Sequence, residues 1–445
     1  MEPMRALLVS TYEMGHQPLG VASAAAALTE AGHDVRALDL QVEPYREDLV
    51  DWADAVAVSV PMHTAMRLAV PLAEKIRERR PDLPIAFYGL YAAVARDRTV
   101  ARLIDKAIVG EYLPGLVSWF ADLDRGVEVD LTVQQFGVPR RDLLPPLDRY
   151  SHLQIGDEHR LAGYVEASHG CRHRCRHCPV PAVYDGLFRI VGVEPVVSDV
   201  AQLVDMGARH ISFGDPDFLN APVYAAKVID AVHRTFPDLT FDVTVKVEHL
   251  LAHPGLLETL AASNVLFVVS AFETVSDHIL RLLDKGHTVA DMARAVEECR
   301  RVGIDIRASW LPFTPWTRPD DLLGVFRFLA DHDLAATTDP VQLSIRLLVP
   351  DGSLLLDLPD MVPYLGDYDP VGLTYRWEYA HPELDRVQAT LAELAAEAAD
   401  RGEDPGTTLT EMWARSAELL DLPASEVIPA GATSGRPRMT EPWFC

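Results

Sequence analysis

Residues 170–179 read Gly-Cys-Arg-His-Arg-Cys-Arg-His-Cys-Pro and contain Cys171, Cys175 and Cys178, three of the five cysteines in the 445-residue chain. A disulfide framework is typical of small secreted chains, whose cysteines are spread along the sequence. A structural zinc site takes four ligands, usually in two separated pairs. Three thiolates on one loop are instead typical ligands of an iron–sulfur cluster. A four-iron cluster held by three cysteines would have one iron open to another ligand.

A zinc site is the alternative interpretation of the same spacing. The three cysteines would then share the ion with one nearby histidine, either His169, His173 or His177. On this interpretation the protein is a non-catalytic zinc- or cluster-binding regulator, and with zinc it would be colourless.

The Cys-x3-Cys-x2-Cys motif, directly after an apolar strand, resembles the signature of the radical S-adenosylmethionine (SAM) superfamily. The resemblance implies that Cys171, Cys175 and Cys178 hold a [4Fe–4S] cluster, that SAM binds the open iron, and that one-electron reduction cleaves SAM to a carbon radical. It also implies that His177, the residue before the third cysteine, packs near the SAM adenine. An electron donor such as flavodoxin or ferredoxin would then be a partner.

The chain is strongly acidic, with 66 acidic against 40 basic residues and a net charge of −26. Such a field repels phosphate backbones and anionic lipids, so we expect a small-molecule substrate, with no nucleic acid and no membrane as partners. No apolar run approaches about 18 residues, and residues 1–5 begin a poor signal peptide. We therefore expect a cytoplasmic protein, and its length favours two or three domains.

Residues 1–125 alternate short apolar strands with helical segments, which are expected at 20–31 and 64–80. The predicted strands are Ala6–Ser10, Val35–Leu40, Ala55–Val60, Ile85–Gly89 and Lys106–Gly110. Strands that are apolar on both faces predict a parallel, doubly wound, Rossmann-like sheet in an α/β protein. Because such sheets bind ligands at the carboxyl ends of their strands, residues 11–20, 61–64 and 89–92 are expected around one crevice.

This first domain resembles the cobalamin-binding (B12-binding) domain that precedes the barrel in one class of radical SAM enzymes. The resemblance rests on Pro18-Leu19-Gly20 and on Glu30-Ala31-Gly32-His33-Asp34-Val35, and it makes cobalamin a candidate cofactor. Many such domains carry Asp-x-His-x-x-Gly, whose histidine binds cobalt from below. The spacing around His16 does not fit that motif, but many members of the class bind cobalamin without the histidine. The absence of Gly-x-Gly-x-x-Gly argues against a dinucleotide.

Residues 126–162, with Pro139, Pro145 and Pro146, are predicted to connect two domains across their junction. Residues 163–350 then repeat a strand-then-helix unit six times. The predicted strands are Tyr164–Ser168, His210–Gly214, Phe241–Val247, Val265–Ala271, Ile304–Trp310 and Val341–Leu347; the helices are expected at 195–206, 223–236, 254–262, 289–302 and 319–332. Such units predict a partial (β/α)6, TIM-like barrel, the fold that the radical SAM resemblance also implies.

Three of these strands carry polar side chains on one face. They are Asp242, Thr244, Lys246 and Glu248; Asp305, Arg307 and Ser309; and Gln342, Ser344 and Arg346. In a barrel covered by helices, the polar face of each strand lines the interior. Since a closed barrel fills its interior with branched apolar side chains, a charged interior indicates a cavity for a polar, zwitterionic ligand such as SAM.

The resemblance also assigns expectations to particular residues of the barrel. Gly214 and Asp215 stand where the family often has Gly-Gly-Glu in contact with the SAM amino group. Glu273, followed by Lys285-Gly286-x-Thr288, matches a pattern whose glutamate lies near SAM, although Ala271 replaces the usual glycine. Lys246, Arg307 and Arg346 are candidates for binding the SAM carboxylate or the substrate.

Residues 351–445 are predicted to form helices at 383–401 and 407–420, followed by a polar arm and the tail Arg438-Met439-Thr440-Glu441-Pro442-Trp443-Phe444-Cys445. The tail resembles that of a radical SAM family ending in Cys-Cys-Ala-Glu-Pro or Cys-selenocysteine-Ala-Glu-Pro. The resemblance implies that Cys445 precedes a UGA codon read as a stop, which makes the protein a selenoprotein candidate. It also implies that Cys445 is a catalytic thiol able to reach the barrel mouth.

Together the resemblances imply a transferase-type enzyme that cleaves SAM and modifies a small molecule. Two kinds of reaction stay open at this point. One is radical methylation or rearrangement, with cobalamin presented by the first domain. The other is transfer of the 3-amino-3-carboxypropyl group of SAM to a soft acceptor, such as arsenite, held by Cys445.

Overall fold

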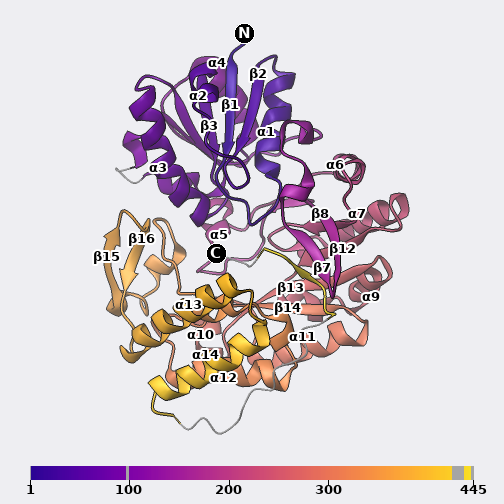
Figure 1. Cartoon of the computed structure of the whole chain (residues 1–445), viewed down its shortest axis with the longest axis vertical. Coiled ribbons are helices and arrows are strands. Elements are labelled where there is room, and N and C mark those ends of the chain that lie inside the picture. Colours follow the sequence, from indigo (N-terminus) through magenta and orange to yellow (C-terminus); the bar gives the residue numbers. More distant parts are fainter. Residues whose placement is uncertain (1, 97–99, 423–434, 442–445) are drawn as a thin grey trace.

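The computed structural model of this chain describes residues 2–96, 100–422 and 435–441. The N-terminal sheet, in indigo and purple, lies at one end of the long axis, and the second sheet and the C-terminal helices occupy the other end (Figure 1). Among the described residues, no helix combines the length and the apolar character needed to cross a lipid bilayer.

The first sheet is parallel throughout, with the strand order β2-β1-β3-β4-β5-β6. Its strands are β1 (Arg5–Ser10), β2 (Asp34–Asp39), β3 (Ala55–Ser59), β4 (Ile85–Tyr88), β5 (Lys106–Gly110) and β6 (Gly126–Asp130). The five predicted strands are confirmed. The sixth, β6, lies at the sheet edge, where Val127 and Val129 are exposed. Residues 126–130 therefore lack the apolar run that identified the other strands. Strand β6 extends the first sheet into the predicted connector.

Helices cover both faces of the first sheet, as expected for a doubly wound fold. They are α1 (Leu19–Glu30), α2 (Glu47–Trp52), α3 (His63–Arg79) and α4 (Tyr112–Asp122). One buried apolar cluster joins the sheet to α3, and a second joins its other face to α1 and α4. The carboxyl ends of the strands are thus left open toward the second sheet.

The second sheet has the strand order β14-β13-β12-β11-β8-β7-β17. Its strands are β7 (His152–Ile155), β8 (Glu158–Val165), β11 (His210–Phe213), β12 (Thr240–Thr244), β13 (Val265–Glu273), β14 (Asp305–Trp310) and β17 (Arg438–Met439). The pairs from β8 to β14 are parallel, and β7 and β17 add antiparallel strands at the edge. The parallel strands form a partial barrel, which confirms the predicted fold class.

The five predicted helices of the partial barrel are confirmed, and two short helices are added to them. The helices are α6 (Val193–Asp205), α7 (Pro222–Thr235), α8 (Val247–Ala252), α9 (Pro254–Ala262), α10 (Asp277–Leu282), α11 (Val289–Arg301) and α12 (Pro319–Asp331). Their apolar faces pack on the sheet in one large buried cluster. The opposite, inner face of the sheet carries polar side chains and faces the site.

The prediction of a sixth barrel strand at Val341–Leu347 is wrong. Pro340–Ser344 forms a 3-10 helix, η7, and this segment meets a neighbour only through an isolated bridge between Phe313 and Arg346. Pro340 has no N–H for a strand ladder and favours the start of a helical turn. The parallel part of the sheet therefore has five strands within the described residues.

The third barrel strand is shorter than predicted. β12 ends at Thr244, and Lys246 is the N-cap residue of α8. Lys246 and Glu248 therefore lie beyond the strand rather than on its polar face. The alternation of polar and apolar residues continues past the end of the strand, because Val245 and Val247 stay buried after the backbone has turned into the helix.

The C-terminal region packs beside the barrel as two helices and a hairpin. Helices α13 (Glu383–Arg401) and α14 (Pro405–Leu419) confirm the two predicted helices, and β15 (Leu365–Asp369) pairs with β16 (Thr374–Trp377). The chain then returns as β17 along β7, where Figure 1 shows it in yellow. Glu441 accepts a hydrogen bond from Tyr12 Oη at 3.1 Å, so the tail reaches the first domain. Cys445 lies outside the described residues.

A buried ion pair ties the two sheets together. Arg141 donates to both carboxylate oxygens of Asp199 on α6, at 2.9 and 2.8 Å, and to the carbonyl of Tyr164 on β8 at 2.7 Å. It also donates to Gln17 in the loop after β1, at 3.3 Å to the side chain. Because all of these acceptors surround one buried guanidinium, its charge is compensated. Arg141 therefore fixes the loop after β1 against the barrel.

Candidate active site

The three cysteines lie on a loop that begins after the short strand β9 (Ser168–Gly170) and ends at α5 (Pro179–Tyr184). Cys171 and Cys175 are buried, Cys178 is partly buried, and none of them forms a disulfide. Gly170 has a φ of +74°, and a Cβ there would lie 2.4 Å from the carbonyl oxygen of Leu187. Only glycine fits this position, so the entry into the loop is determined locally.

The cysteine loop fits an iron–sulfur cluster by its chemistry. Burial raises the pKa of the Cys171 thiol and raises that of Cys178 to about 12. Buried sulfurs of this kind stay neutral on their own, and a metal cluster would supply the positive charge that stabilises thiolates. The predicted ligand set is therefore chemically consistent with the structure, and its role as cluster ligand stays a prediction.

The structure brings His177 and Glu273 together, as both were expected near SAM. Glu273 Oε1 lies 3.0 Å from His177 Nε2 and accepts a hydrogen bond from Lys285 Nζ at 2.8 Å. Burial by itself would raise the pKa of Glu273, but the Lys285 ammonium and the His177 imidazole hold it well below its usual range. The sequence placed Lys285 in the motif without assigning it this contact.

The backbone of Glu273 is strained. Its φ is +66°, in the left-handed region that costs a residue with a side chain about 1–3 kcal/mol. The register between β13 and β14 also shifts between Ala271 and Glu273. The strain and the bulge turn the Glu273 side chain out of the strand alternation, toward the cysteine loop.

Gly214 and Asp215 lie at the end of β11 but make different contacts. A Cβ on Gly214 would lie 1.9 Å from Tyr164 Oη, so this position requires glycine. Asp215 accepts hydrogen bonds from the Ala167 N–H at 3.0 Å and from the Ser168 hydroxyl. Burial raises the pKa of Asp215 to about 7. Asp215 therefore holds the segment that leads into the cysteine loop, and its predicted contact with the SAM amino group stays a prediction.

The three predicted cationic ligands already have partners in the structure. Arg307 pairs with Asp339 at 2.8 Å, and Arg346 pairs with Asp385 at 2.8 Å. Lys246 lies 3.5 Å from a carboxylate oxygen of Glu248. Of the three, Arg346 lines a cavity next to His177 and Glu273.

That cavity, which we call the central cavity, has a volume of about 370 Å³ and is lined from both sheets. The loop after β3 contributes residues 61–64, and the cysteine loop contributes His177 and Cys178. The ends of β13 and β14 contribute Glu273 and residues 309–311, and the segment after η7 contributes apolar residues between 345 and 348. A molecule bound there would contact the cysteine loop and the first domain at the same time.

A second cavity, which we call the crevice, lies at the carboxyl ends of the first sheet and has a volume of about 220 Å³. Its lining includes Glu13, Met14, Pro61, Met62, Gly89 and Leu90. The three loops that were expected around one crevice therefore do meet there. The crevice adjoins a side cavity of about 780 Å³ beside α1 and α4, because both are lined by Tyr112, Glu166 and His169.

These adjoining spaces fit a ligand with a flat body and a long arm, such as cobalamin. Small residues of α1, Ser23, Ala26 and Ala27, line the side cavity and leave it open. His16 does not line the crevice; its ring stacks on Tyr164 with 4.8 Å between the centroids. Glu13 does line the crevice, and its buried Oε2 has no hydrogen-bond partner among the described residues. The structure therefore gives no support to His16 as a cobalt ligand.

Sequence reasoning missed a buried polar network between the two sheets. His169, directly before the cysteine loop, lies 3.2 Å from Glu111 at the end of β5 and 3.2 Å from Glu166. Tyr184 also donates to Glu111 at 2.9 Å. Burial lowers the pKa of His169, but the two carboxylates raise it to about 10 overall. The only sequence signal was the position of Glu111 directly after a predicted strand.

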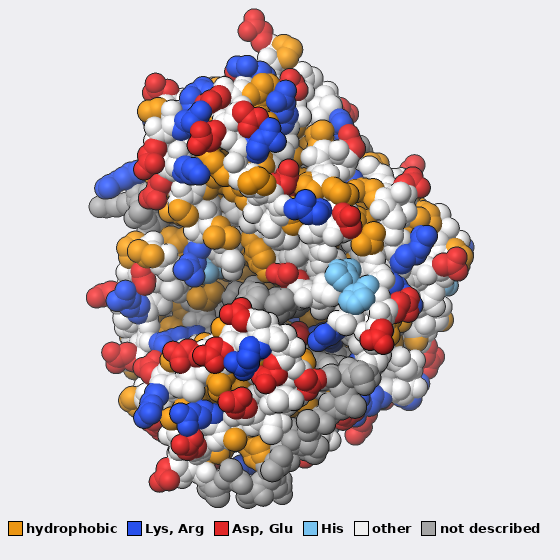
Figure 2. Space-filling model, in the orientation of Figure 1, with side chains coloured by type: hydrophobic (Ala, Val, Ile, Leu, Met, Phe, Trp, Pro, Cys, Tyr) orange, Lys and Arg blue, Asp and Glu red, His pale blue; other side chains and the backbone are white. Residues whose placement is uncertain are grey.

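The face of the molecule in Figure 2 mixes acidic and basic side chains rather than gathering the basic ones into one patch. The expectation from the net charge that nucleic acid is not the main partner stays a prediction.

Two known families match separate parts of the chain. Residues 165–317 match the Radical SAM superfamily, and residues 5–112 match the B12 binding domain. The first match contains the three cysteines together with Gly214, Asp215 and Glu273. The second contains the strands β1 to β5 and the loops of the crevice.

One relative and two solved structures are similar to the chain over most of its length. The chain is 23% identical to the hopanoid C-3 methylase of Methylococcus capsulatus over 327 residues, which cover 68% of this chain and 62% of that methylase. The structure of the cobalamin-dependent SAM radical enzyme OxsB with aqua-cobalamin bound matches with a TM-score of 0.68 at 14% identity, over 87% of this chain and 66% of that one. The methyltransferase TsrM from Kitasatospora setae, with tryptophan and a SAM analogue bound, matches with a TM-score of 0.62 at 18% identity, over 79% of this chain and 75% of that one.

At these identities the solved structures show a shared fold. The chain spans 49% to 62% of the length of the first curated relatives that it matches. The relatives' activities and substrates therefore belong to those proteins.

Proposed function

We propose that the chain, whose residues 165–317 match the Radical SAM superfamily and whose residues 5–112 match the B12 binding domain, is a transferase that methylates a small, largely apolar molecule. The match over residues 165–317 favours this enzyme over a non-catalytic zinc-binding regulator. Methyl transfer is favoured because the relatives include a hopanoid methylase and the structural neighbours include a methyltransferase.

The observation that carries the proposal is the central cavity. It is lined by the cysteine loop, by Glu273 and by the loop after β3 of the first domain. Most of its wall is apolar, with Trp310 and Leu311 among its members, and Ser309 and Gln342 add a few polar atoms. Pockets of this kind, mostly apolar with a few polar groups that set orientation, suit small-molecule substrates.

The wall of the central cavity also carries a negative charge, on Glu273. Glu273 is ionised at neutral pH because Lys285 and His177 lower its pKa. Both contacts use Oε1, so Oε2 is the oxygen left to accept a hydrogen bond from an ammonium or hydroxyl group of SAM. Gln342 Oε1 accepts from the backbone N–H of Trp310 at 3.1 Å, which holds the wall at the end of β14.

The cofactors would be held by the two sets of residues described above. Cys171, Cys175 and Cys178 would hold a [4Fe–4S] cluster, and the crevice with its side cavity would hold cobalamin. When bound, the cluster supplies the electron that cleaves SAM, and cobalamin supplies a carrier for the methyl group. A flavodoxin or ferredoxin as electron donor and a cytoplasmic location stay predictions.

The test is anaerobic reconstitution with iron, sulfide and cobalamin, followed by SAM with a deuterated methyl group and a reductant. We expect a brown protein that binds about one cobalt per chain and releases 5′-deoxyadenosine. Cys175→Ala should abolish both the brown colour and SAM cleavage, while Cys299→Ala, on helix α11 outside the loop, should retain both. A reconstituted cluster that leaves SAM intact would refute the proposal.

A second candidate reaction is 3-amino-3-carboxypropyl transfer to a soft acceptor, with Cys445 as the catalytic thiol. It is favoured by the tail, because Thr440 N donates to the carbonyl of His152 at 2.9 Å and Glu441 meets Tyr12 next to the junction. Release of 5′-methylthioadenosine in place of 5′-deoxyadenosine, lost in Cys445→Ala and dependent on arsenite, would support it.

A further inference from the structure

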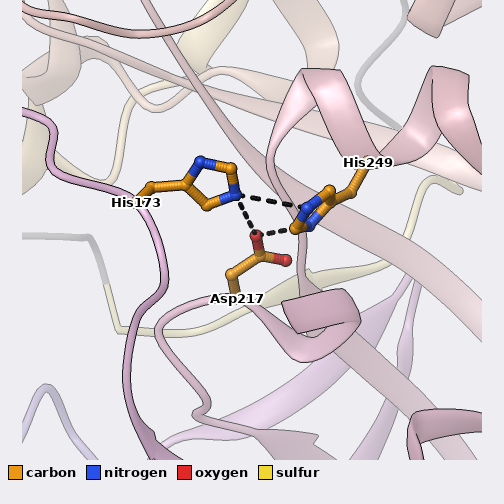
Figure 3. A group of neighbouring side chains, drawn as sticks. All are labelled: His173, Asp217 and His249. Carbon is orange, nitrogen blue, oxygen red and sulfur yellow. Dashed lines mark hydrogen bonds and ion pairs between the residues drawn. The ribbon is translucent and has the colours of Figure 1, made fainter. Parts of the chain in front are cut away.

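Three side chains from separate elements converge behind the cysteine loop. His173 lies within that loop, Asp217 is the N-cap of the 3-10 helix η5 (Phe218–Asn220), and His249 lies on α8. Figure 3 shows the two rings and the carboxylate pointing toward one another. One ligand atom from each residue lies within 4.8 Å of the others.

The contacts in this group are close, but its shortest one is not a hydrogen bond. His249 Nδ1 lies 2.7 Å from Asp217 Oδ2, yet both atoms are buried and neither has a hydrogen-bond partner among the described residues. Asp217 is 0% exposed. A buried carboxylate oxygen that accepts no hydrogen bond is costly, and a cation bound by both atoms would satisfy both lone pairs.

The other atoms of the group are already engaged in ways that suit metal ligands. Asp217 Oδ1 accepts from the N–H of Leu219 at 3.1 Å, which leaves Oδ2 facing the histidines. The second ring nitrogen of His173, Nδ1, lies 3.8 Å from a carboxylate oxygen of Glu248. Metal-binding histidines usually have such a carboxylate near their other nitrogen. The carboxylate of Glu248 also lies 3.5 Å from the Lys246 ammonium, so it offsets the positive charge that Lys246 brings near the group.

We propose that His173, Asp217 and His249 bind a divalent transition-metal ion that is separate from the iron–sulfur cluster. Two imidazoles and one carboxylate are a common ligand set for zinc and for non-heme iron, with positions left open for water. Ligands about 2.0–2.2 Å from a tetrahedral ion lie about 3.3–3.6 Å apart. The measured separations of Asp217 Oδ2 from the two histidines, 2.7 and 4.0 Å, bracket that range.

The bound ion would fasten the cysteine loop to two other elements of the barrel. It would link the loop to η5 through Asp217 and to α8 through His249. Asn220, at the end of η5, already accepts from the backbone N–H of Arg172 at 3.2 Å and contacts Cys171 Sγ at 3.7 Å. The competing interpretation is a metal-free cluster, in which His173 Nε2 and His249 Nε2, 3.2 Å apart, share one hydrogen bond.

Zinc content of the holoprotein tests the proposal, because the cluster then occupies the three cysteines. The reconstituted protein is incubated with Zn²⁺ and desalted, and zinc and iron are measured by mass spectrometry. We expect one zinc per chain, with zinc affinity reduced at least about tenfold in His249→Gln and in Asp217→Asn. His253→Gln is the matched control, since its ring lies 6.0 Å from that of His249 but outside the group. Iron content should be unchanged in His249→Gln.

The absence of tight zinc in the wild type, or zinc retained by both ligand variants, would overturn the proposal. If a variant also loses iron, X-ray absorption at the zinc edge of the wild-type holoprotein decides instead. A first shell of nitrogen and oxygen with two imidazoles supports the site. A shell containing sulfur would place the zinc at cysteines and overturn the proposal. This outcome is independent of whether the protein methylates its substrate.

Discussion

Two buried glutamates face the junction of the sheets in opposite surroundings. Glu273, at the end of β13, contacts Lys285 and His177, which hold its pKa well below the usual range. Glu13, in the loop after β1, has no ion pair in the described part of the chain, and burial raises its pKa to about 8. Burial is similar at the two sites, so the neighbouring cations decide which glutamate is charged.

This difference divides the junction by charge. The barrel side presents an ionised carboxylate to the central cavity, where the ammonium group of SAM would be a suitable partner. The first-domain side presents a mostly protonated carboxyl to the crevice at neutral pH. An uncharged wall of this kind suits the face of a large macrocycle better than it suits a cation.

The largest effect is expected from Lys285→Met, which removes the cation from the buried pair. Leaving Glu273 buried without its main partner should lower the free energy of unfolding by about 3–5 kcal/mol. Denaturant unfolding, followed by circular dichroism, measures the change. Adding Glu273→Gln to this variant should recover part of the loss, because no buried charge is then left unpaired. Equal losses in the single and double variants would show that Glu273 is not the partner that matters.

The second largest effect is expected from Glu13→Gln, which should change how the free energy of unfolding depends on pH. Between about pH 4.5 and 8 the folded chain keeps a proton on Glu13 that the unfolded chain releases, so stability falls as pH rises. The slope from this one group is about 1.4 kcal/mol per pH unit. Glu13→Gln should remove that part of the slope, measured by urea unfolding at several pH values.

The control for Glu13 is Glu30→Gln on the exposed end of α1, which should leave the slope unchanged. Asp215 and Asp39 also have raised pKa values, about 7 and about 6. A residual slope is therefore expected in every variant. Identical slopes in the wild type and Glu13→Gln would mean that Glu13 is ionised in the fold, as Glu273 is.

A smaller effect is expected from Asp215→Asn. The carboxylate accepts from both Ala167 and Ser168, and an amide would turn a donor toward one of them. The expected loss is about 1–3 kcal/mol, with less iron per chain after reconstitution because the segment leads into the cysteine loop. Asp157→Asn, on an exposed turn, is the control. Normal iron content together with a loss of SAM binding would instead support the predicted contact of Asp215 with the SAM amino group.

The smallest effect is expected from His16→Phe, which preserves a ring beside Tyr164. Since His16 does not line the crevice, cobalamin content and the visible spectrum of bound cobalamin should be unchanged. A spectral shift that shows loss of an imidazole ligand would reverse this conclusion. It would also mean that the loop containing Glu13 rearranges when cobalamin binds.

Much of the fold could be predicted from local pattern. The five strands of the first sheet and the helices between the barrel strands follow from apolar periodicity, which is a property of neighbouring residues. The prediction of a sixth barrel strand was wrong because polar and apolar residues alternate in η7 as they would in a strand. Pro340 nevertheless favours a helical turn there. The edge strand β6 was missed because its valines are exposed, so it carries no burial signal.

The candidate site was predictable only in part. The cysteine spacing and the positions of His177 and Glu273 are visible in sequence, but their contact depends on the left-handed backbone at Glu273. That no described residue gives Glu13 Oε2 a hydrogen bond depends on which elements surround it in space. The same holds for His173, Asp217 and His249, which come from three separate segments.

The sequence by itself therefore determined the chemistry of the cysteine loop and the two kinds of sheet, because spacing and periodicity are local. Only the tertiary structure decided which buried carboxylate is charged and where β17 docks. It also decided that two histidines and Asp217 meet behind the loop. These contacts depend on strand order and loop closure over long separations, which the residues next to each one do not encode.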